Sequence, residues 1–195
     1  MVKLLVMADK HTATGKVKKE HAKKISGSSD EESSYSGMVE EPMGAYGNSP
    51  ANASLRTVGL MGMDGKKAFA GIQNDNDFIN IIRNGIPKEA MTHLMEIADI
   101  TLTEMASITH TSDRTLRRYT PQQKLSQEQS ERMIEIAKLY SRGEEVFGSI
   151  DNFKEWMNTV LLPFGNKKPK EFLDTSLGIG MIMDELGRIQ HGIFA

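Results

Sequence analysis

The chain contains no cysteine among its 195 residues. This absence excludes disulfide bonds and thiolate metal sites, and it agrees with a reducing compartment. A long apolar run near the amino terminus is also missing. The longest one there, Leu4–Ala8, is too short for the core of a signal peptide or for a membrane span. We therefore expect a soluble, cytoplasmic protein with no membrane contact.

An excess of positive charge is absent as well. The formal net charge is -2 and the isoelectric point is about 6.2. A chain with this balance does not coat nucleic acid indiscriminately, so any DNA contact must come from a small, local basic patch. The hydrophobic content of 38% is sufficient for a core, and the length allows one or two small domains.

Catalytic motifs are missing too. There is no Gly-x-Ser-x-Gly elbow, no His-Glu-x-x-His and no complete glycine-rich dinucleotide fingerprint. Gly62–Lys66 lacks the flanking residues of a phosphate-binding loop, and His93 has no second metal ligand at helical spacing. We expect no catalytic residue, no metal site and no cofactor, and we interpret the chain as a non-enzyme.

Residues 1–54 are predicted to form a disordered, low-complexity tail. Ser, Gly, Asn, Ala and Pro dominate its second half, and its few large side chains cannot repay the entropy of ordering it. The lysine-rich run Lys16–Lys24 is interpreted as a solvated charge run, with phosphate contact or an amphipathic turn as alternatives. Leu55–Met63 is expected to be a short strand or an extended arm.

Residues 99–119 carry the pattern around which the chain is organised. Thr101 and Glu104 predict a capping box at the start of a short helix. The buried side of this helix is predicted to consist of Met105, Ala106 and Ile108. His110 then falls where a helix-turn-helix requires positive φ, a region in which histidine is enriched among side chains other than glycine.

A second, basic helix follows the turn. Ser112 is predicted to cap it, and Leu116 is expected to point inward. Two short helices joined by a tight turn, with a basic second helix, indicate a helix-turn-helix that enters the major groove of DNA. The candidate DNA-binding residues are Ser112, Arg114, Thr115, Arg117 and Arg118. A helical hairpin with a solvated basic face is the alternative interpretation.

The remaining periodic segments predict an all-α fold. Helices are expected over residues 76–85, 87–98, 127–141, 150–159, 169–174 and 176–190. The helix beginning near Gln127 is expected to stop at Gly143, and Trp156 is predicted to anchor the core. In the last helix the expected apolar seam consists of Leu177, Met181, Ile182, Leu186 and Ile189. Three glycines in that helix, Gly178, Gly180 and Gly187, suggest close approach by another helix or a partner.

The second half of the chain, residues 76–195, resembles the Xre antitoxins of RES–Xre toxin–antitoxin pairs, within the MbcA/ParS/Xre antitoxins. The motifs that carry the resemblance are Arg114–Arg118, Val146–Gly148, Trp156–Met157, Pro169–Thr175, and Gly178 followed by Asp184–Ala195. The helix-turn-helix is generic, whereas the carboxy-terminal run is specific. The sequence departs from the family's pattern at His110 and Thr111, where the family usually has a glycine and an aliphatic residue. It also departs at Phe153, where a small residue is common in the family.

The resemblance implies a homodimeric antitoxin of two parts. An Xre-like helix-turn-helix domain over residues 55–125 would dimerise, bind operator DNA and repress the shared operon. A carboxy-terminal domain over residues 126–195 would bind and block a RES-domain toxin that degrades NAD. The toxin-binding residues implied at the matching positions are Arg188, His191, Gly192, Ile193, Phe194 and Ala195.

Two other interpretations stay open from the sequence. The chain can be a stand-alone helix-turn-helix regulator or a partition-accessory DNA-binding protein, which needs the basic helix but not the apolar end. It can also be a helical scaffold without any DNA contact.

Overall fold

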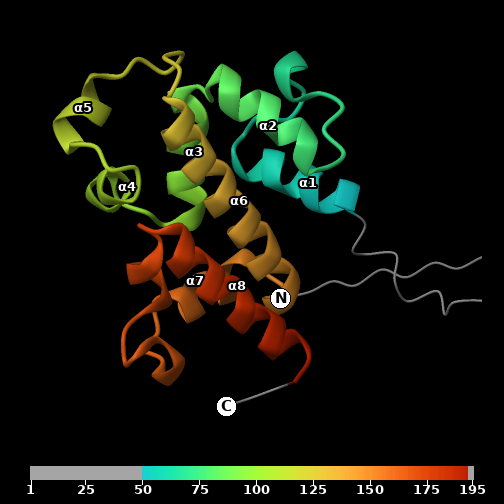
Figure 1. Cartoon of the computed structure of the whole chain (residues 1–195), viewed down its shortest axis with the longest axis vertical. Coiled ribbons are helices and arrows are strands. Elements are labelled where there is room, and N and C mark those ends of the chain that lie inside the picture. The colour runs from blue at the N-terminus through green and yellow to red at the C-terminus, as the bar shows by residue number, and fades with distance from the viewer. Residues whose placement is uncertain (1–49, 193–195) are drawn as a thin grey trace, which may run out of the picture. The chain divides into compact units, whose positions relative to one another are not determined.

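The computed structural model describes residues 50–192, all of which belong to one compact unit spanning residues 42–195 (Figure 1). Within the described range the chain is helical and contains no β-strand, which confirms the predicted all-α class. The α-helices are α1 (Pro50–Leu60), α2 (Asp75–Asn84), α3 (Lys88–Ala98), α4 (Leu102–Ile108), α5 (Asp113–Arg118), α6 (Gln127–Phe147), α7 (Ile150–Met157) and α8 (Ser176–Gln190). Three short 3₁₀ helices are η1 (Lys67–Phe69), η2 (Leu162–Phe164) and η3 (Pro169–Phe172).

Helix α6 is the central element of this unit. It packs against α1 and α2 and also against α7 and α8. Its buried residues include the predicted Met133, Ile134, Ile136, Ala137 and Tyr140. The Tyr140 hydroxyl donates to the Ala98 carbonyl at 3.2 Å, and burial raises the pKa of this phenol. One helix therefore contacts elements on both sides of the predicted domain boundary at residue 126.

The predicted end of α6 at Gly143 is wrong, because the helix continues to Phe147. A Cβ atom at Gly143 would lie 2.3 Å from the ring of Phe153, which is fully buried. Gly143 is thus a place of close packing inside a helix and not a helix terminator. Phe153 also contacts Tyr140 and Trp156, with ring centroids 5.1 and 5.8 Å away. Trp156 is only partly buried, so Phe153 is the centre of this aromatic cluster.

The expectation of a strand or arm over Leu55–Met63 is also wrong. Residues 50–60 form α1, so residues 50–54 are helical; the rest of the predicted tail lies outside the described residues. The buried side of α1 includes two polar residues, Ser54 and Thr57. They interrupt the helical spacing of apolar residues by which an amphipathic helix is predicted from sequence. The Thr57 hydroxyl donates to the Ala53 carbonyl at 2.8 Å, so this buried polar group is satisfied within the helix.

Helices α2 and α3 follow the predicted ranges closely. The N-cap of α2 is Asn74, two residues before the expected start, and Gly85 ends the helix at a φ of 77°. In α3 the residues Ala90, Met91 and Leu94 are buried as predicted, while Ile97 is partly buried against the core. No helix in residues 50–192 has both the length and the apolar character needed to cross a membrane.

Helix α8 has the predicted bounds but a different buried face. Ile182 and Leu186 are fully buried and Ile189 is partly buried, whereas the side chains of Leu177 and Met181 are 79% and 40% exposed. A Cβ atom at Gly178 would meet the Phe172 carbonyl oxygen at 2.1 Å, so close approach is confirmed at this glycine. Gly180 and Gly187 have no such neighbour within 4 Å among the described residues, so no helix of this part of the chain approaches them, and approach by a partner stays a prediction.

Candidate functional site

The first candidate site is the helix-turn-helix of α4 and α5. The capping box is confirmed: the Glu104 N–H donates to the Thr101 hydroxyl at 3.2 Å, and the Thr101 N–H donates to the Glu104 carboxylate at 2.7 Å. Met105, Ala106 and Ile108 are buried as predicted. The Thr103 hydroxyl donates to Asp113 at 2.8 Å and so joins the two helices across the turn.

The turn itself depends on His110, whose φ of 49° confirms the predicted left-handed backbone. The Thr111 N–H donates to the Ala106 carbonyl at 2.9 Å, which closes the turn. Ser112 caps α5 by accepting the Thr115 N–H at 3.1 Å, and the hydroxyls of Ser112 and Thr115 lie 2.8 Å apart. Both hydroxyls are therefore part of the cap, and their contact with DNA stays a prediction.

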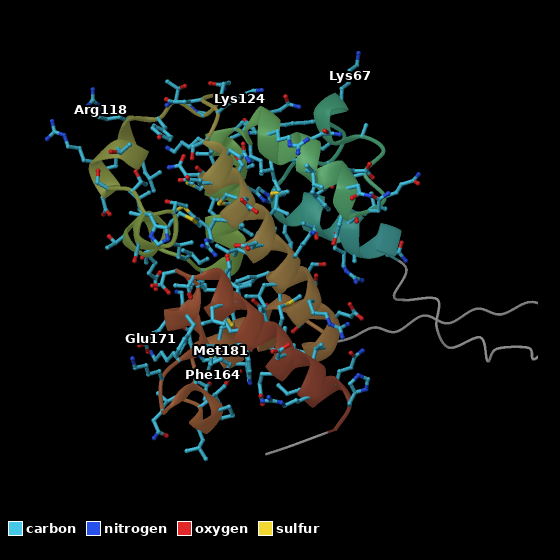
Figure 2. All side chains as sticks on the ribbon, viewed as in Figure 1. Lys67, Arg118, Lys124, Phe164, Glu171 and Met181 are labelled. Carbon is cyan, nitrogen blue, oxygen red and sulfur yellow. The ribbon has the colours of Figure 1, made fainter. Side chains whose placement is uncertain are left out.

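The basic side chains of α5 point away from the core. Leu116 is fully buried, which fixes the rotation of this six-residue helix and leaves Arg114, Arg117 and Arg118 exposed. Arg118 extends from the edge of the unit in Figure 2. Within residues 50–192 no hydrogen bond or ion pair is found for these three guanidinium groups. Their charge is available to an anionic partner, and their contact with DNA stays a prediction.

The second candidate site is the end of α8. Arg188 forms an ion pair with Glu185 at 2.7 Å and lines a hollow of about 160 Å³ beside Pro163, Phe164 and Met181. His191 is the exposed C-cap residue of α8, and Gly192 has a φ of 67°. The other predicted toxin-binding residues, Ile193, Phe194 and Ala195, lie outside the described residues.

The two candidate sites are on different helices. Helix α5 packs on α4, whereas α8 packs on α6 and η3. The α5 and α8 labels lie in different regions of Figure 1. The predicted DNA-binding and toxin-binding residues of the described part therefore lie on two separate surfaces.

A polar contact that the sequence did not reveal joins the helix-turn-helix to η3, the 3₁₀ helix on which α8 packs. The Lys170 ammonium in η3 lies 2.9 Å from the Glu104 carboxylate and donates to the Asp99 carbonyl at 2.6 Å. Burial raises the pKa of Glu104, but hydrogen bonds from Thr101 and Lys170 outweigh it, so the pKa is lowered overall. No local pattern signals this contact, because its partners are far apart in the chain.

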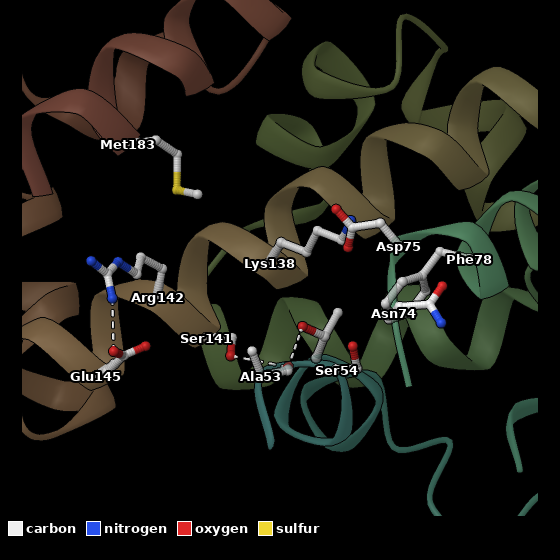
Figure 3. Close-up of a pocket in the computed structure, with 11 residues that line it drawn as sticks. Ala53, Ser54, Asn74, Asp75, Phe78, Lys138, Ser141, Arg142, Glu145 and Met183 are labelled. Carbon is white, nitrogen blue, oxygen red and sulfur yellow. Dashed lines mark hydrogen bonds and ion pairs between the residues drawn. The ribbon is translucent and has the colours of Figure 1, made fainter. Parts of the chain in front are cut away.

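A hollow of about 480 Å³ lies among α1, α2, α6 and α8 (Figure 3). Its wall includes the ring of Phe78 and the side chain of Met183. Two ion pairs line this hollow, Lys138 with Asp75 and Arg142 with Glu145, and each has a nitrogen–oxygen distance of 2.7 Å. All four charges are thus paired, and residues 50–192 contain no group of three potential metal ligands.

Comparison with known families matches two regions of the chain. Residues 77–138 match the antitoxin Xre-like helix-turn-helix domain, and residues 142–192 match the antitoxin Xre/MbcA/ParS C-terminal toxin-binding domain. The two matches meet inside α6, the helix that packs against both parts.

Two relatives carry the same name. The chain is 28% identical over 120 residues to "Antitoxin Xre" of Yersinia enterocolitica, covering 60% of this chain and 80% of that protein. It is 30% identical over 78 residues to "Antitoxin Xre" of Photorhabdus laumondii, covering 40% of this chain and 53% of that protein.

The chain thus combines a helix-turn-helix domain with a carboxy-terminal toxin-binding domain, which defines a helix-turn-helix antitoxin. It belongs to the Xre antitoxin family, within the wider Xre/MbcA/ParS group.

Proposed function

We propose that this antitoxin binds and blocks a RES-domain toxin that degrades NAD, as the antitoxin of a type II toxin–antitoxin pair. The observation that carries the proposal is the toxin-binding match over residues 142–192, which includes three of the predicted contact residues, Arg188, His191 and Gly192. All three are exposed or partly exposed. The side of α8 that carries Leu177 and Met181 offers additional apolar surface to a partner.

The proposed contact is made by the last turn of α8 and the residues after it. The Arg142 guanidinium donates to the Gln190 side chain and so ties this end of α8 to α6. Arg188 is held by Glu185 but its side chain is still 53% exposed. A fixed helix end lowers the entropy cost of presenting Arg188 and residues 191–195 to a toxin cleft.

We further propose that the protein is a cytoplasmic homodimer that represses its own operon by binding operator DNA through α5. Arg114, Arg117 and Arg118 support this part, because they are exposed and have no ion pair within residues 50–192. The same arginines favour a second candidate, a stand-alone regulator or partition-accessory protein that has no toxin partner.

Coexpression of the tagged chain with the product of the gene beside its own distinguishes the two candidates. The proposal predicts that this neighbour is a RES-domain protein that copurifies with the chain in a fixed ratio. A neighbour without toxin character, or a RES-domain protein that elutes separately, would contradict the antitoxin function and favour the stand-alone regulator.

A further inference from the structure

We infer that Lys124 and Lys67, which lie outside the helix-turn-helix, contact phosphates of the same DNA duplex as α5 and extend the DNA-binding surface. This inference rests on the proposed DNA binding by α5. Lys124 belongs to the α5–α6 connection and Lys67 begins η1. Arg118, Lys124 and Lys67 lie along one edge of the unit in Figure 2.

The connection that carries Lys124 is held firmly in place. The Lys88 N–H donates to the Gln123 carbonyl, and the Glu89 N–H donates to the Pro121 carbonyl, both at 2.9 Å. The Leu125 N–H donates to the Ile86 carbonyl at 2.8 Å. Because these bonds fix the loop on the α2–α3 junction, the fold determines where Lys124 lies.

Lys124 retains the capacity to bind a phosphate. Its ammonium donates to the Asn84 carbonyl at 2.8 Å, which uses one of three N–H donors. Its neighbour across a common hollow is Lys66, whose ammonium is paired with Glu89. Lys67, the next residue after Lys66, is exposed and has no ion pair within residues 50–192.

The charge distribution on this edge favours an anionic partner. The segment Arg114–Gln127 contains Arg114, Arg117, Arg118 and Lys124 and no acidic residue. Glu89, the acidic residue paired at this edge, is already neutralised by Lys66. On a chain with a net charge of -2, such a one-sided stretch is the kind of local patch that a DNA backbone requires.

The experiment measures the affinity of the full chain for a labelled duplex from the region upstream of its own gene, over a range of salt concentrations. The compared chains are the wild type, Lys67→Gln/Lys124→Gln, and the control Lys167→Gln/Lys168→Gln, which removes equal charge from exposed residues before η3. Each lost phosphate contact lowers the steepness of log K against log salt by about 0.9. We expect a decrease of about 1.8 for each protomer in the first variant and none in the control.

The outcomes separate this inference from the function on which it rests. If the wild type binds the duplex and Arg114→Ala/Arg117→Ala/Arg118→Ala does not, DNA binding by α5 holds. An unchanged salt slope in Lys67→Gln/Lys124→Gln, or an equal decrease in the control, then overturns only the inference. If the wild type binds neither this duplex nor an unrelated one, both are overturned.

Discussion

The Lys170 ammonium lies 2.9 Å from the Glu104 carboxylate, so the toxin-binding region and the helix-turn-helix share an ion pair. The Lys170 side chain is only 12% exposed and also donates to the Asp99 carbonyl at the end of α3. Glu104 at the same time caps α4 through the Thr101 N–H. One lysine thus fixes the junction of α3 and α4 against η3.

Replacing Lys170 with methionine is expected to destabilise the fold. The substitution keeps much of the apolar length but leaves the Glu104 carboxylate and the Asp99 carbonyl without their shared donor. Hydrogen bonds to charged groups contribute about 1.5–3 kcal/mol to stability. We therefore expect the free energy of unfolding, measured by urea titration at neutral pH, to fall by an amount of that order. The control is Lys167→Met at an exposed lysine; equal losses in both variants would contradict the role of the Lys170 contact.

The contribution of Glu104 is expected to depend on pH. Its pKa is lowered in the fold from 4.5, so its carboxylate contributes stability that is present above pH 4.5. That stability is lost as the pH falls through the lowered folded value, because the protonated acid no longer pairs with Lys170. Urea unfolding of the wild type and Glu104→Gln should therefore differ at pH 7 and converge in acid. A difference that stays constant across this range would contradict the account.

The two glycines Gly178 and Gly180 are expected to respond in opposite ways to alanine. Gly178→Ala would place a methyl group 2.1 Å from the Phe172 carbonyl oxygen, and overpacking of this kind costs about 1–3 kcal/mol. Gly180 faces open space, so Gly180→Ala gains helix propensity of up to about 1 kcal/mol. Thermal unfolding of both variants tests this; destabilisation by Gly180→Ala would mean that another surface already covers that position.

The triple variant Arg114→Ala/Arg117→Ala/Arg118→Ala is expected to lose operator binding without losing its fold. Each bidentate contact between an arginine and guanine contributes about 1–3 kcal/mol of discrimination, and these guanidinium groups form no hydrogen bond or ion pair within residues 50–192. Mobility-shift titration measures the affinity for operator DNA, and circular dichroism checks that the variant keeps its helical fold. Unchanged operator affinity would contradict DNA binding through α5, whereas a wild type that binds no duplex would support a helical scaffold without DNA contact.

The helix-turn-helix was predictable because its determinants are local. Thr101 with Glu104 signals the first cap, Ser112 signals the second, and His110 is one of the few side chains that tolerate the left-handed turn. Such features act within a few residues, so the sequence reveals them without knowledge of the tertiary structure.

Features that depend on distant packing were not predictable. Helix α1 buries Ser54 and Thr57 against α6, so its sequence lacks the apolar period of an amphipathic helix. Gly143 has the appearance of a helix end, yet it makes room for the ring of Phe153. Leu177 fits the apolar seam of α8 by spacing but is 79% exposed, because Ile179 takes the buried side instead. The Glu104–Lys170 contact is likewise a product of tertiary structure.

The proposed block of an NAD-degrading toxin by the last residues of this antitoxin is measured most directly by the level of cellular NAD. Cells would express the neighbouring RES-domain protein with the full chain, with a chain lacking residues 192–195, or with the Arg114/Arg117/Arg118 triple alanine variant as a control that keeps the carboxy-terminal end. We expect NAD to be preserved by the full chain and the control and to collapse with the truncated chain at equal expression. Preserved NAD in cells with the truncated chain would contradict the account.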